Sequence, residues 1–190
     1  MQVITWKQFL EKGLQLGNSF TSVTVGVFDG VHRGHKALLE RIVSYNAQYA
    51  PMVVTFKENH KTENKEQLIE IFSFQKRLAV FEELGIKIVI AVEFTDEFKC
   101  MPGIEFLEIL FKRGNIGFFA AGADFRCGYQ LDTDAETIKD FFISRGIPAE
   151  IVPQLTEDSL PISSSRIRNA IAEGDRILAE KLLGAELFRG

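Results

Sequence analysis

The sequence predicts an α/β protein with a doubly wound, mostly parallel five-stranded sheet. Short apolar runs rich in β-branched residues alternate with amphipathic helical patterns along most of the 190 residues. Strands that are separated by helices of this length form βαβ units, in which the strands lie parallel. The apolar runs are continuous rather than alternating, as in IKIVIAV at 86–92. Continuous runs are typical of strands that helices cover on both faces of the sheet.

The expected strands are short apolar runs bounded by turn residues: Thr21–Phe28, Pro51–Phe56, Ile86–Val92, Ile116–Ala121 and Ile147–Val152. The expected helices carry apolar residues three and four apart: Gly34–Tyr49, Ser73–Leu84, Gly103–Lys112, Ala135–Ser144, Ser165–Glu173 and Asp175–Leu183. The polar segment Lys57–Gln67 lacks periodicity and is expected to be a loop. No internal repeat or linker divides the chain, so a single domain over residues 1–190 is expected.

Composition and charge exclude several classes of protein. Apolar residues make up 46% and charged residues 25%, which excludes a disordered or collagen-like chain. A net charge of −4 argues against a general nucleic-acid binder, which needs a basic face. No stretch approaches the roughly 18 uninterrupted apolar residues of a membrane span, and MQVITWKQFLEKG does not resemble a secretory signal. Cys100 and Cys127 form no CxxC pair, and a soluble, cytoplasmic protein is expected.

The segment GVFDGVHRGH joins the end of the first strand, a tight turn and the start of a helix. Gly30 and Gly34 allow the backbone to approach a ligand without an intervening Cβ. His32 and His35 are three residues apart, so they share one face of the first helical turn. The N–H groups there and the positive end of the helix dipole favour a phosphate. We therefore expect a phosphate site to which two imidazoles add hydrogen-bond donors.

Three other interpretations of this segment are less favoured. The histidines could be helix caps or a chance pair, but two of the chain's three histidines fall within this one HxGH sequence. A zinc site would need a third ligand, and none is evident. The order of residues also differs from the GxxxxGK[ST] of a P-loop.

A second anion site is expected at PISSSRIR, near the C-terminal end of the chain. Ser163, Ser164 and Ser165 precede an apolar-periodic run, which marks the N-terminus of a helix. Arg168 follows Ser165 by three residues and so lies on the same side of the first turn, whereas Arg166 should face elsewhere. Hydroxyls, N–H groups and a guanidinium together can bind an anion. N-capping serines beside a solvated arginine are the alternative interpretation.

A third candidate is GADFRCG, directly after the fourth expected strand. In doubly wound folds the ligand cleft lies beyond the carboxyl ends of the strands, which Asp124 would reach. Alternatively, Asp124 caps neighbouring amides within a turn. The residues alone leave these two interpretations equal.

Taken in order, the three motifs resemble those of the FMN adenylyltransferase module of prokaryotic FAD synthetases. GVFDGVHRGH is similar to that family's GxFDGVHxGH, whereas HxGH alone is shared by the wider nucleotidyltransferase superfamily. SSSRIR resembles its SSTxIR, and GADFRCG resembles its GxDFxFG. VVTF, EFTDEF and the closing GDRILAEKLLG are similar as well, so the resemblance covers essentially the whole chain.

The resemblance implies a Rossmann-like fold and the reaction ATP + FMN → FAD + pyrophosphate, with Mg²⁺. The FMN phosphate would attack the α-phosphorus of ATP directly and in line, without a general base. The phosphates rather than protein ligands would carry Mg²⁺. ATP and FMN are the expected partners, with neither nucleic acid nor a membrane, while the oligomeric state stays open.

By motif position, the resemblance implies three groups of site residues. The residues that would act in catalysis, by holding ATP phosphates in the transition state, are His32, His35 and Arg168. The residues that would bind ATP and its phosphates are Gly26, Phe28, Asp29, Gly30, Gly34, Ser163, Ser164 and Ser165. The residues that would face FMN are Phe56, His60, Asp124, Phe125 and Arg126.

Departures from the family pattern leave other functions open. After the second strand the family has TFxPHP, whereas this chain has TFKENH, with no proline and with the histidine displaced by one. Cys127 stands where the family has Phe. The family's C-terminal riboflavin kinase domain, with its GRxLGxPTAN-like motif, is absent from the sequence, so no riboflavin kinase activity is expected. The alternatives are a nucleotidyltransferase with another phosphorylated acceptor and a non-catalytic flavin or nucleotide sensor.

Overall fold

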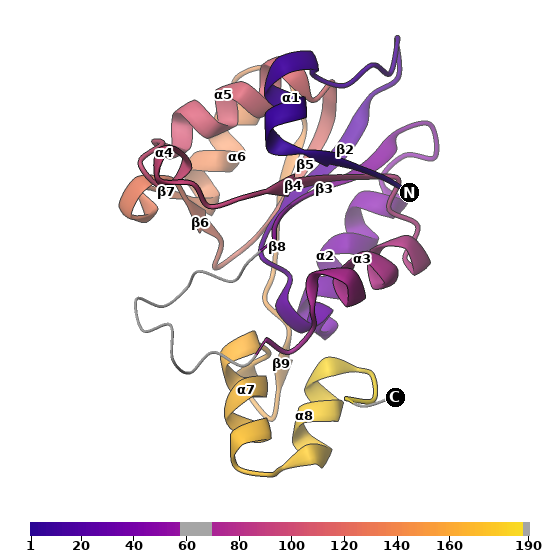
Figure 1. Cartoon of the computed structure of the whole chain (residues 1–190), viewed down its shortest axis with the longest axis vertical. Helices are drawn as coiled ribbons and strands as arrows, with labels where there is room; N and C mark the ends of the chain where they lie inside the picture. Colours follow the sequence, from indigo (N-terminus) through magenta and orange to yellow (C-terminus); the bar gives the residue numbers. More distant parts are fainter. Residues whose placement is uncertain (58–69, 188–190) are drawn as a thin grey trace.

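A six-stranded parallel sheet forms the centre of the protein (Figure 1). The structure is a computed structural model that describes residues 1–57 and 70–187. The strand order is β1-β4-β3-β2-β5-β8, and every neighbouring pair is parallel. The strands are β1 (Gln2–Thr5), β2 (Thr21–Val25), β3 (Ala50–Phe56), β4 (Ile88–Val92), β5 (Ile116–Gly122) and β8 (Ala149–Val152). β3 and β4 follow β2 on one side of it in the sheet, whereas β5 and β8 lie on its other side. The topological switch point is therefore between β2 and β5.

Helices cover both faces of the sheet (Figure 1). One face packs against α1 (Trp6–Lys12), α5 (Gly103–Arg113) and α6 (Ala135–Ile143). The other packs against α2 (Arg33–Ser44) and α3 (Phe74–Glu83), and the same apolar core continues below the sheet into α7 (Ser164–Ala172) and α8 (Arg176–Leu183). The small elements are α4 (Asp96–Lys99), the 3₁₀ turns η1 (Asp29–Val31) and η2 (Tyr129–Leu131), and two antiparallel hairpins of β6 (Arg126–Cys127) with β7 (Thr133–Asp134) and β9 (Thr156–Glu157) with β10 (Leu160–Pro161).

Strand residues alternate between two apolar cores, one on each face of the sheet. Val54 and Ile90 belong to the core with α1, α5 and α6, whereas Val53 and Val89 belong to the core with α2 and α3. All four side chains are fully buried. Burial on both faces explains why these strands are continuously apolar. The structure thus confirms the doubly wound α/β fold class.

The sheet has six strands rather than the predicted five. The missed strand, β1, pairs with β4 at the edge of the sheet and leads directly into α1, which was missed as well. Thr5 caps α1, because its hydroxyl accepts the N–H of Gln8 while the Gln8 side chain accepts the N–H of Thr5. This reciprocal capping has a sequence signature, Thr-x-x-Gln. The strand escaped prediction because four residues, QVIT, carry too little periodicity.

Several predicted boundaries also differ. The first predicted strand runs to Phe28, but β2 ends at Val25, because Phe28 is in the left-handed region with φ +55°. The helix predicted to reach Tyr49 ends at Ser44. Neither α4 nor the two hairpins were predicted. Of the loop predicted over Lys57–Gln67, only Lys57 lies within the described residues. Across 1–57 and 70–187, no helix has the length and apolar character that a membrane crossing needs.

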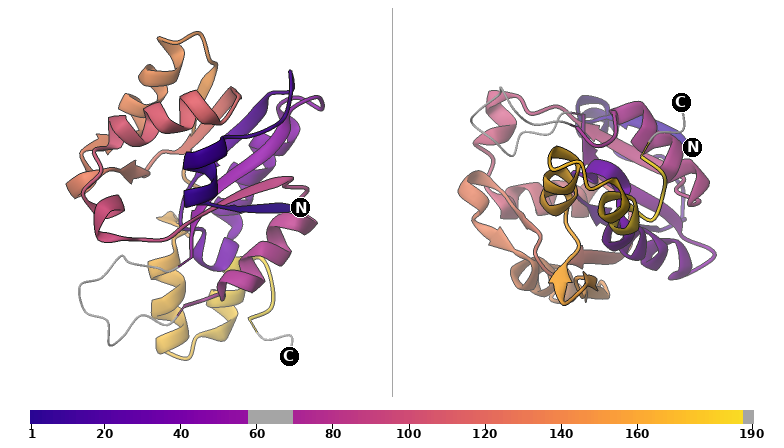
Figure 2. Two further views of the ribbon diagram at one scale, coloured as in Figure 1. Left: turned by 45° about the horizontal axis from the view of Figure 1, so that its top comes forward. Right: turned by 90° about the horizontal axis from the view of Figure 1, so that it is seen from below.

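The helical pair α7–α8 lies below the sheet, and in the view from below it crosses the middle of the molecule (Figure 2). Charged side chains attach this pair and the β9–β10 hairpin to α2. Glu157 pairs with Arg33 of α2 and with Lys181 of α8, and these two cations lower the pKa of the Glu157 carboxyl. Lys36 Nζ donates to the carbonyl of Gly184, 3.1 Å away. The start of α7 is thereby held close to the start of α2.

Candidate active site

A cavity of about 700 Å³ lies at the carboxyl ends of the central strands, beside the switch point between β2 and β5. The N-terminal ends of α2 and α7 line one part of it, and aromatic side chains line another. Of the residues singled out from the sequence, Gly30 does not line the cavity and His60 lies outside the described residues. The others all line it: Gly26, Phe28, Asp29, His32, Gly34, His35, Phe56, Asp124, Phe125, Arg126, Ser163, Ser164, Ser165 and Arg168.

A strained turn carries the chain from β2 into α2. Phe28 and Val31 have positive φ angles of 55° and 43°, which cost L-residues conformational energy. The Phe28 ring is buried against Phe81, at a centroid distance of 5.7 Å, and this contact supports the unusual backbone. Gly30 has φ +78°, and a Cβ there would lie 2.9 Å from Ile71. Gly30 is therefore needed for the backbone conformation of the turn and for its close packing against Ile71, and it does not line the cavity.

The two imidazoles stack on each other at the start of α2. Their ring centroids are 3.5 Å apart and their planes differ by 16°. His32 is the N-cap residue, and its Nδ1 accepts the backbone N–H of His35 at 3.2 Å. Because Nδ1 is the acceptor, the neutral His32 ring carries its proton on Nε2. His32 can therefore offer an Nε2–H donor beside the backbone N–H groups of the helix.

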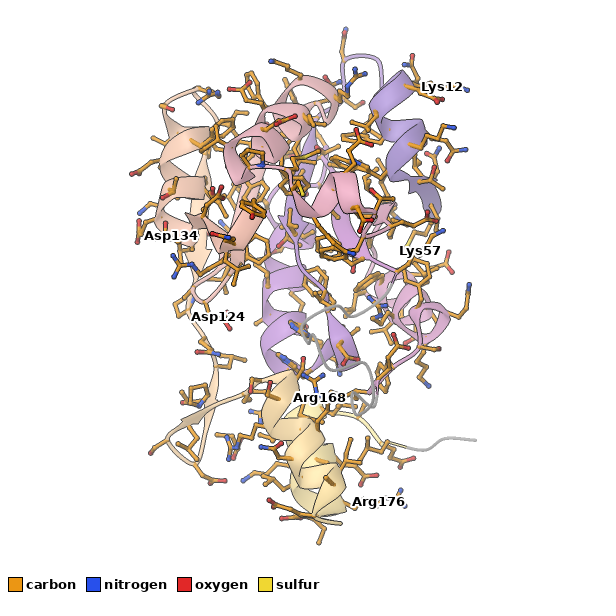
Figure 3. The ribbon with its side chains drawn as sticks, turned by 60° about the vertical axis from the view of Figure 1, so that its left-hand side comes forward. Lys12, Lys57, Asp124, Asp134, Arg168 and Arg176 are labelled. Carbon is orange, nitrogen blue, oxygen red and sulfur yellow. The ribbon has the colours of Figure 1, made fainter. Side chains whose placement is uncertain are left out.

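The start of α7 brings hydroxyl groups and a guanidinium to the same cavity. The Ser163 side chain accepts the N–H of Arg166 and caps α7, and the Ser164 hydroxyl donates to the carbonyl of Asp29 at 3.0 Å. Ser165 is exposed and lies 3.5 Å from Nη2 of Arg168. Arg168 comes from the middle of α7, and Figure 3 shows it toward the main body of the protein. Two helix N-termini and an arginine thus border one volume, an arrangement suited to a polyphosphate.

Asp29 is buried and both of its carboxylate oxygens are engaged. Oδ1 accepts the backbone N–H groups of Ile71 and Phe72, at 3.0 and 3.2 Å. Oδ2 accepts Nη1 of Arg168 at 2.7 Å. A carboxylate can only accept hydrogen bonds, and it repels phosphate oxygens. Asp29 therefore orients Arg168 at the cavity, and its expected part in the ATP site would be exerted through that guanidinium.

The aromatic part of the cavity is built from β3, the β4–α4 segment and α5. Phe56 lies 4.6 Å from Phe94 and 5.9 Å from Phe98, measured between ring centroids, and Phe98 contacts Phe106. Met101 and Leu131 complete this apolar wall. Such a wall can hold a flat aromatic ring system. Sequence reasoning missed these side chains other than Phe56, although Phe94 and Phe98 lie within EFTDEF.

The comparison with known protein families decides the assignment. A sequence model described as FAD synthetase matches residues 15–166. The chain belongs to the FAD synthetase family. Among curated relatives, the bifunctional riboflavin kinase/FMN adenylyltransferase of Escherichia coli K12 is 29% identical over 167 residues, which are 85% of this chain and 53% of the relative. The protein of the same name from Bacillus subtilis is 28% identical, over 87% of this chain and 54% of the relative. The chain therefore spans about half the length of these relatives.

Solved structures share the fold of this chain. A structure titled as a macrolide-efflux protein from Streptococcus pneumoniae has a TM-score of 0.83 and 27% identity, and the match covers 98% of this chain and 63% of that one. A pantoate-beta-alanine ligase from Francisella tularensis has a TM-score of 0.59 with 16% identity, over 91% of this chain and 78% of that one. The second similarity concerns the fold alone.

The segment GADFRCG begins at Gly122, the last residue of β5, and continues through the following loop and β6. Figure 3 shows Asp124 on this loop, above α7. Asp124 and Arg126 are exposed at the cavity wall, and Gln154 approaches Asp124 at 3.5 Å. Cys127, which replaces the family's Phe, is partly buried, and burial together with the charge of Asp132 raises the pKa of its thiol to about 12. The thiol is therefore neutral near pH 7 and serves as an apolar wall group.

Arg166 faces away from the cavity, as the sequence analysis expects. Its Nη1 donates to the carbonyls of Glu157 and Leu160, at 2.8 and 3.0 Å, and so attaches α7 to the β9–β10 hairpin. We expect Arg166→Met to lower the stability of the chain by about 2 kcal/mol, because hydrogen bonds that involve a charged group contribute roughly 1.5–3 kcal/mol. At about 2–4 °C for each kcal/mol in a chain of this size, the melting temperature should fall by about 4–8 °C. Calorimetry should show the loss of stability, and kinetic measurements on the same preparation should show nearly unchanged constants. Kinetic losses as large as those of Arg168→Lys would contradict the placement of Arg166 outside the site.

Proposed function

We propose that this chain transfers the adenylyl group of MgATP to the phosphate of FMN, with FAD and pyrophosphate as products. The observation that carries the proposal is the single cavity that joins a polyphosphate-type end, at α2 and α7, to an aromatic end at Phe56, Phe94 and Phe98. Membership of the FAD synthetase family and curated relatives named for FMN adenylyltransferase activity support the same reaction.

At the polar end, the chain would act by positioning and by electrostatic stabilisation. Backbone N–H groups at the starts of α2 and α7, the imidazole of His32 and the guanidinium of Arg168 are fixed by the fold before substrate binds. Donors fixed in this way stabilise the charge that moves onto pyrophosphate as its bond to the α-phosphorus breaks. His35, stacked on His32, would act beside it. Ser165 would bind phosphate as well.

At the aromatic end, the isoalloxazine ring would lie against Phe56 and its neighbours, with Phe125 and Arg126 at the edge. The FMN phosphate would then point toward the α-phosphorus of ATP. That phosphate is already anionic at pH 7, so the attack needs no general base. Among the residues that the structure describes, no three His, Cys, Asp or Glu side chains cluster as metal ligands. Mg²⁺ would therefore arrive bound to the phosphates of ATP.

The acceptor tests the proposal. We expect FMN to be converted to FAD with release of pyrophosphate, and riboflavin to yield neither product. Riboflavin fits the aromatic end but lacks the nucleophilic phosphate, so it should act as a competitive inhibitor against FMN. The measurement is side-by-side turnover with MgATP, with products separated by chromatography and pyrophosphate assayed by a coupled enzyme.

The two alternative functions give different results in the same assay. Turnover of another phosphorylated metabolite without turnover of FMN would assign the chain to a different nucleotidyltransferase reaction. Tight binding of FMN or ATP without pyrophosphate from any acceptor would assign it to the sensor class.

A further inference from the structure

Arg77 is a fully buried arginine of α3 that the proposed function does not use. Only 1% of its surface is exposed, and it is not among the residues that line the cavity. Its Nη1 donates to the carbonyls of Val27 and Phe56, at 2.7 and 2.9 Å, and its Nη2 donates to the carbonyl of Lys57 at 2.9 Å. The guanidinium thus donates hydrogen bonds to three backbone carbonyl groups at and just beyond the carboxyl ends of β2 and β3.

These carbonyl groups belong to the two segments that form opposite parts of the site. Val27 directly precedes Phe28, whose left-handed backbone begins the turn to His32. Phe56 lines the aromatic wall, and Lys57 follows it. The Thr55 hydroxyl also donates to the carbonyl of Val27, at 3.1 Å, so β3 and the turn are joined twice. One side chain therefore fixes the end of β2 and the end of β3 relative to each other.

Burying this charge carries a free-energy cost. Burial lowers the pKa of Arg77 from its usual value, while the nearby charges of Glu70 and Asp29 favour the protonated form. An apolar side chain of similar volume in such a position is often neutral or stabilising for the fold. The hydrogen bonds of Arg77 instead specify where three peptide groups lie. Val27 and Phe56 line the cavity, so the positions of these peptide groups determine its shape.

We propose that Arg77 is a positioning residue that couples the nucleotide end of the cavity to the acceptor end. This inference rests on the proposed function, because it concerns how the two substrates are brought into line. Arg77 contacts neither substrate in this account; it acts through Val27 and Phe56. Its loss should therefore impair both substrates together, which a contact residue at one end would not do.

The test compares Arg77→Lys and Arg77→Met with two matched controls at the other end of β2. Thr21 and Ser22 are fully buried, and their hydroxyls donate to the carbonyls of Gly114 and Ile42, at 2.7 and 2.6 Å. Thr21→Val and Ser22→Ala remove buried side-chain-to-carbonyl hydrogen bonds without touching the site. For each variant, kcat and both KM values are measured well below its melting temperature.

We expect Arg77→Lys to lower kcat/KM on the order of tenfold for ATP and for FMN alike, because a single ammonium cannot replace the fork and small misplacements are costly. Arg77→Met, which removes every hydrogen bond of the guanidinium, should lose more. The controls should lose stability and keep their kinetic constants. Unchanged kinetics in folded Arg77→Lys, or equal losses in the controls, would overturn the proposal. If Arg77→Met fails to fold, Arg77→Lys still decides.

A binding measurement separates this proposal from the proposed function. In the wild-type chain, α,β-methylene ATP and FMN are titrated singly and together, with flavin fluorescence as the signal. We expect each ligand to tighten the binding of the other, and Arg77→Lys to reduce that coupling. A wild-type chain that shows coupled binding but makes no FAD would reject the proposed reaction and keep the role of Arg77. Uncoupled binding in the wild type would reject the role of Arg77 even where FAD is formed.

Discussion

His32→Asn is expected to lower kcat on the order of 100-fold, a loss typical for removal of one preorganised donor to a developing anion. In the proposed reaction His32 would have two separable tasks. Its Nδ1 caps α2 by accepting the N–H of His35, and its Nε2–H would donate to a phosphate oxygen of the substrate. Asparagine is among the best N-cap residues, so the cap and the fold should be kept. Its amide ends short of the Nε2 position, so the donor is lost.

His32→Gln is the complementary variant. The longer amide can reach the Nε2 position with an N–H donor, but it gives up the Nδ1 acceptor of the cap. We therefore expect this variant to keep more of kcat than His32→Asn and to melt at a lower temperature. Loss of an N-cap costs roughly 1 kcal/mol. If instead the variant with the lower melting temperature also had the lower kcat, His32 would act only through the stability of α2.

The kinetic constants identify the step that His32 serves. A donor whose hydrogen bond strengthens only in the transition state changes kcat and leaves the affinity for ATP nearly constant. We expect His35→Ala to show the same pattern, because His35 stacks on His32 and leaves it unsupported when removed. Full kcat with a raised KM for ATP in either variant would assign the histidines to ground-state binding.

The sequence predicts the fold class and most of the motif residues because both are encoded locally. Apolar runs and helical spacing identify β2, β3, β4, β5 and β8, and HxGH places two imidazoles on one helical turn. The edge strand β1 is too short to show a period, and its neighbour β4 lies more than 80 residues away. Pairing of that kind is decided by tertiary packing, which a local pattern does not contain.

The missed parts of the site depend on contacts between distant segments. The chain has 17 Phe, and composition alone assigns them to the core. Which of them face the cavity depends on how the β4–α4 segment crosses the ends of the strands, as at Phe94 and Phe98. Arg77 looks like an ordinary charged residue of an amphipathic helix until the carbonyls of Val27 and Phe56 are seen around it. No spacing rule points to such a residue.

Asp29→Asn is expected to lower kcat/KM for ATP on the order of 100-fold, in line with the cost of leaving one member of a buried ion pair without its partner. Asp29 and Arg168 are 139 residues apart in sequence and 2.7 Å apart in space, with side chains 4% and 13% exposed. The substitution keeps an oxygen for the N–H groups of Ile71 and Phe72. With that oxygen on the two N–H groups, the amide NH2 faces the guanidinium, so donor meets donor and Arg168 loses its orientation.

A double-mutant cycle shows whether Asp29 acts through Arg168. Arg168→Lys should also be poorly tolerated, because a point charge does not replace a planar fork that bonds the Asp29 carboxylate and, in the proposed reaction, would bond a phosphate as well. If the two residues form one unit, the double variant should lose little more than the worse single variant. Additive losses would show that Asp29 contributes independently of Arg168, for instance by holding Ile71 and Phe72 in place.

A second arginine–carboxylate pair serves as the control for the cycle. Arg41 and Glu150 form a bidentate pair, at 2.7 and 2.6 Å, between α2 and β8, and their side chains are 34% and 46% exposed. An exposed pair contributes roughly 0–1 kcal/mol to stability, and neither residue lines the cavity. Glu150→Gln should therefore leave kcat and both KM values unchanged. Kinetic losses in Glu150→Gln that match those of Asp29→Asn would mean that any weakening of the α2 contacts disturbs the site. Unchanged kinetics beside a large loss in Asp29→Asn would locate the effect at the Arg168 guanidinium, which lines the cavity.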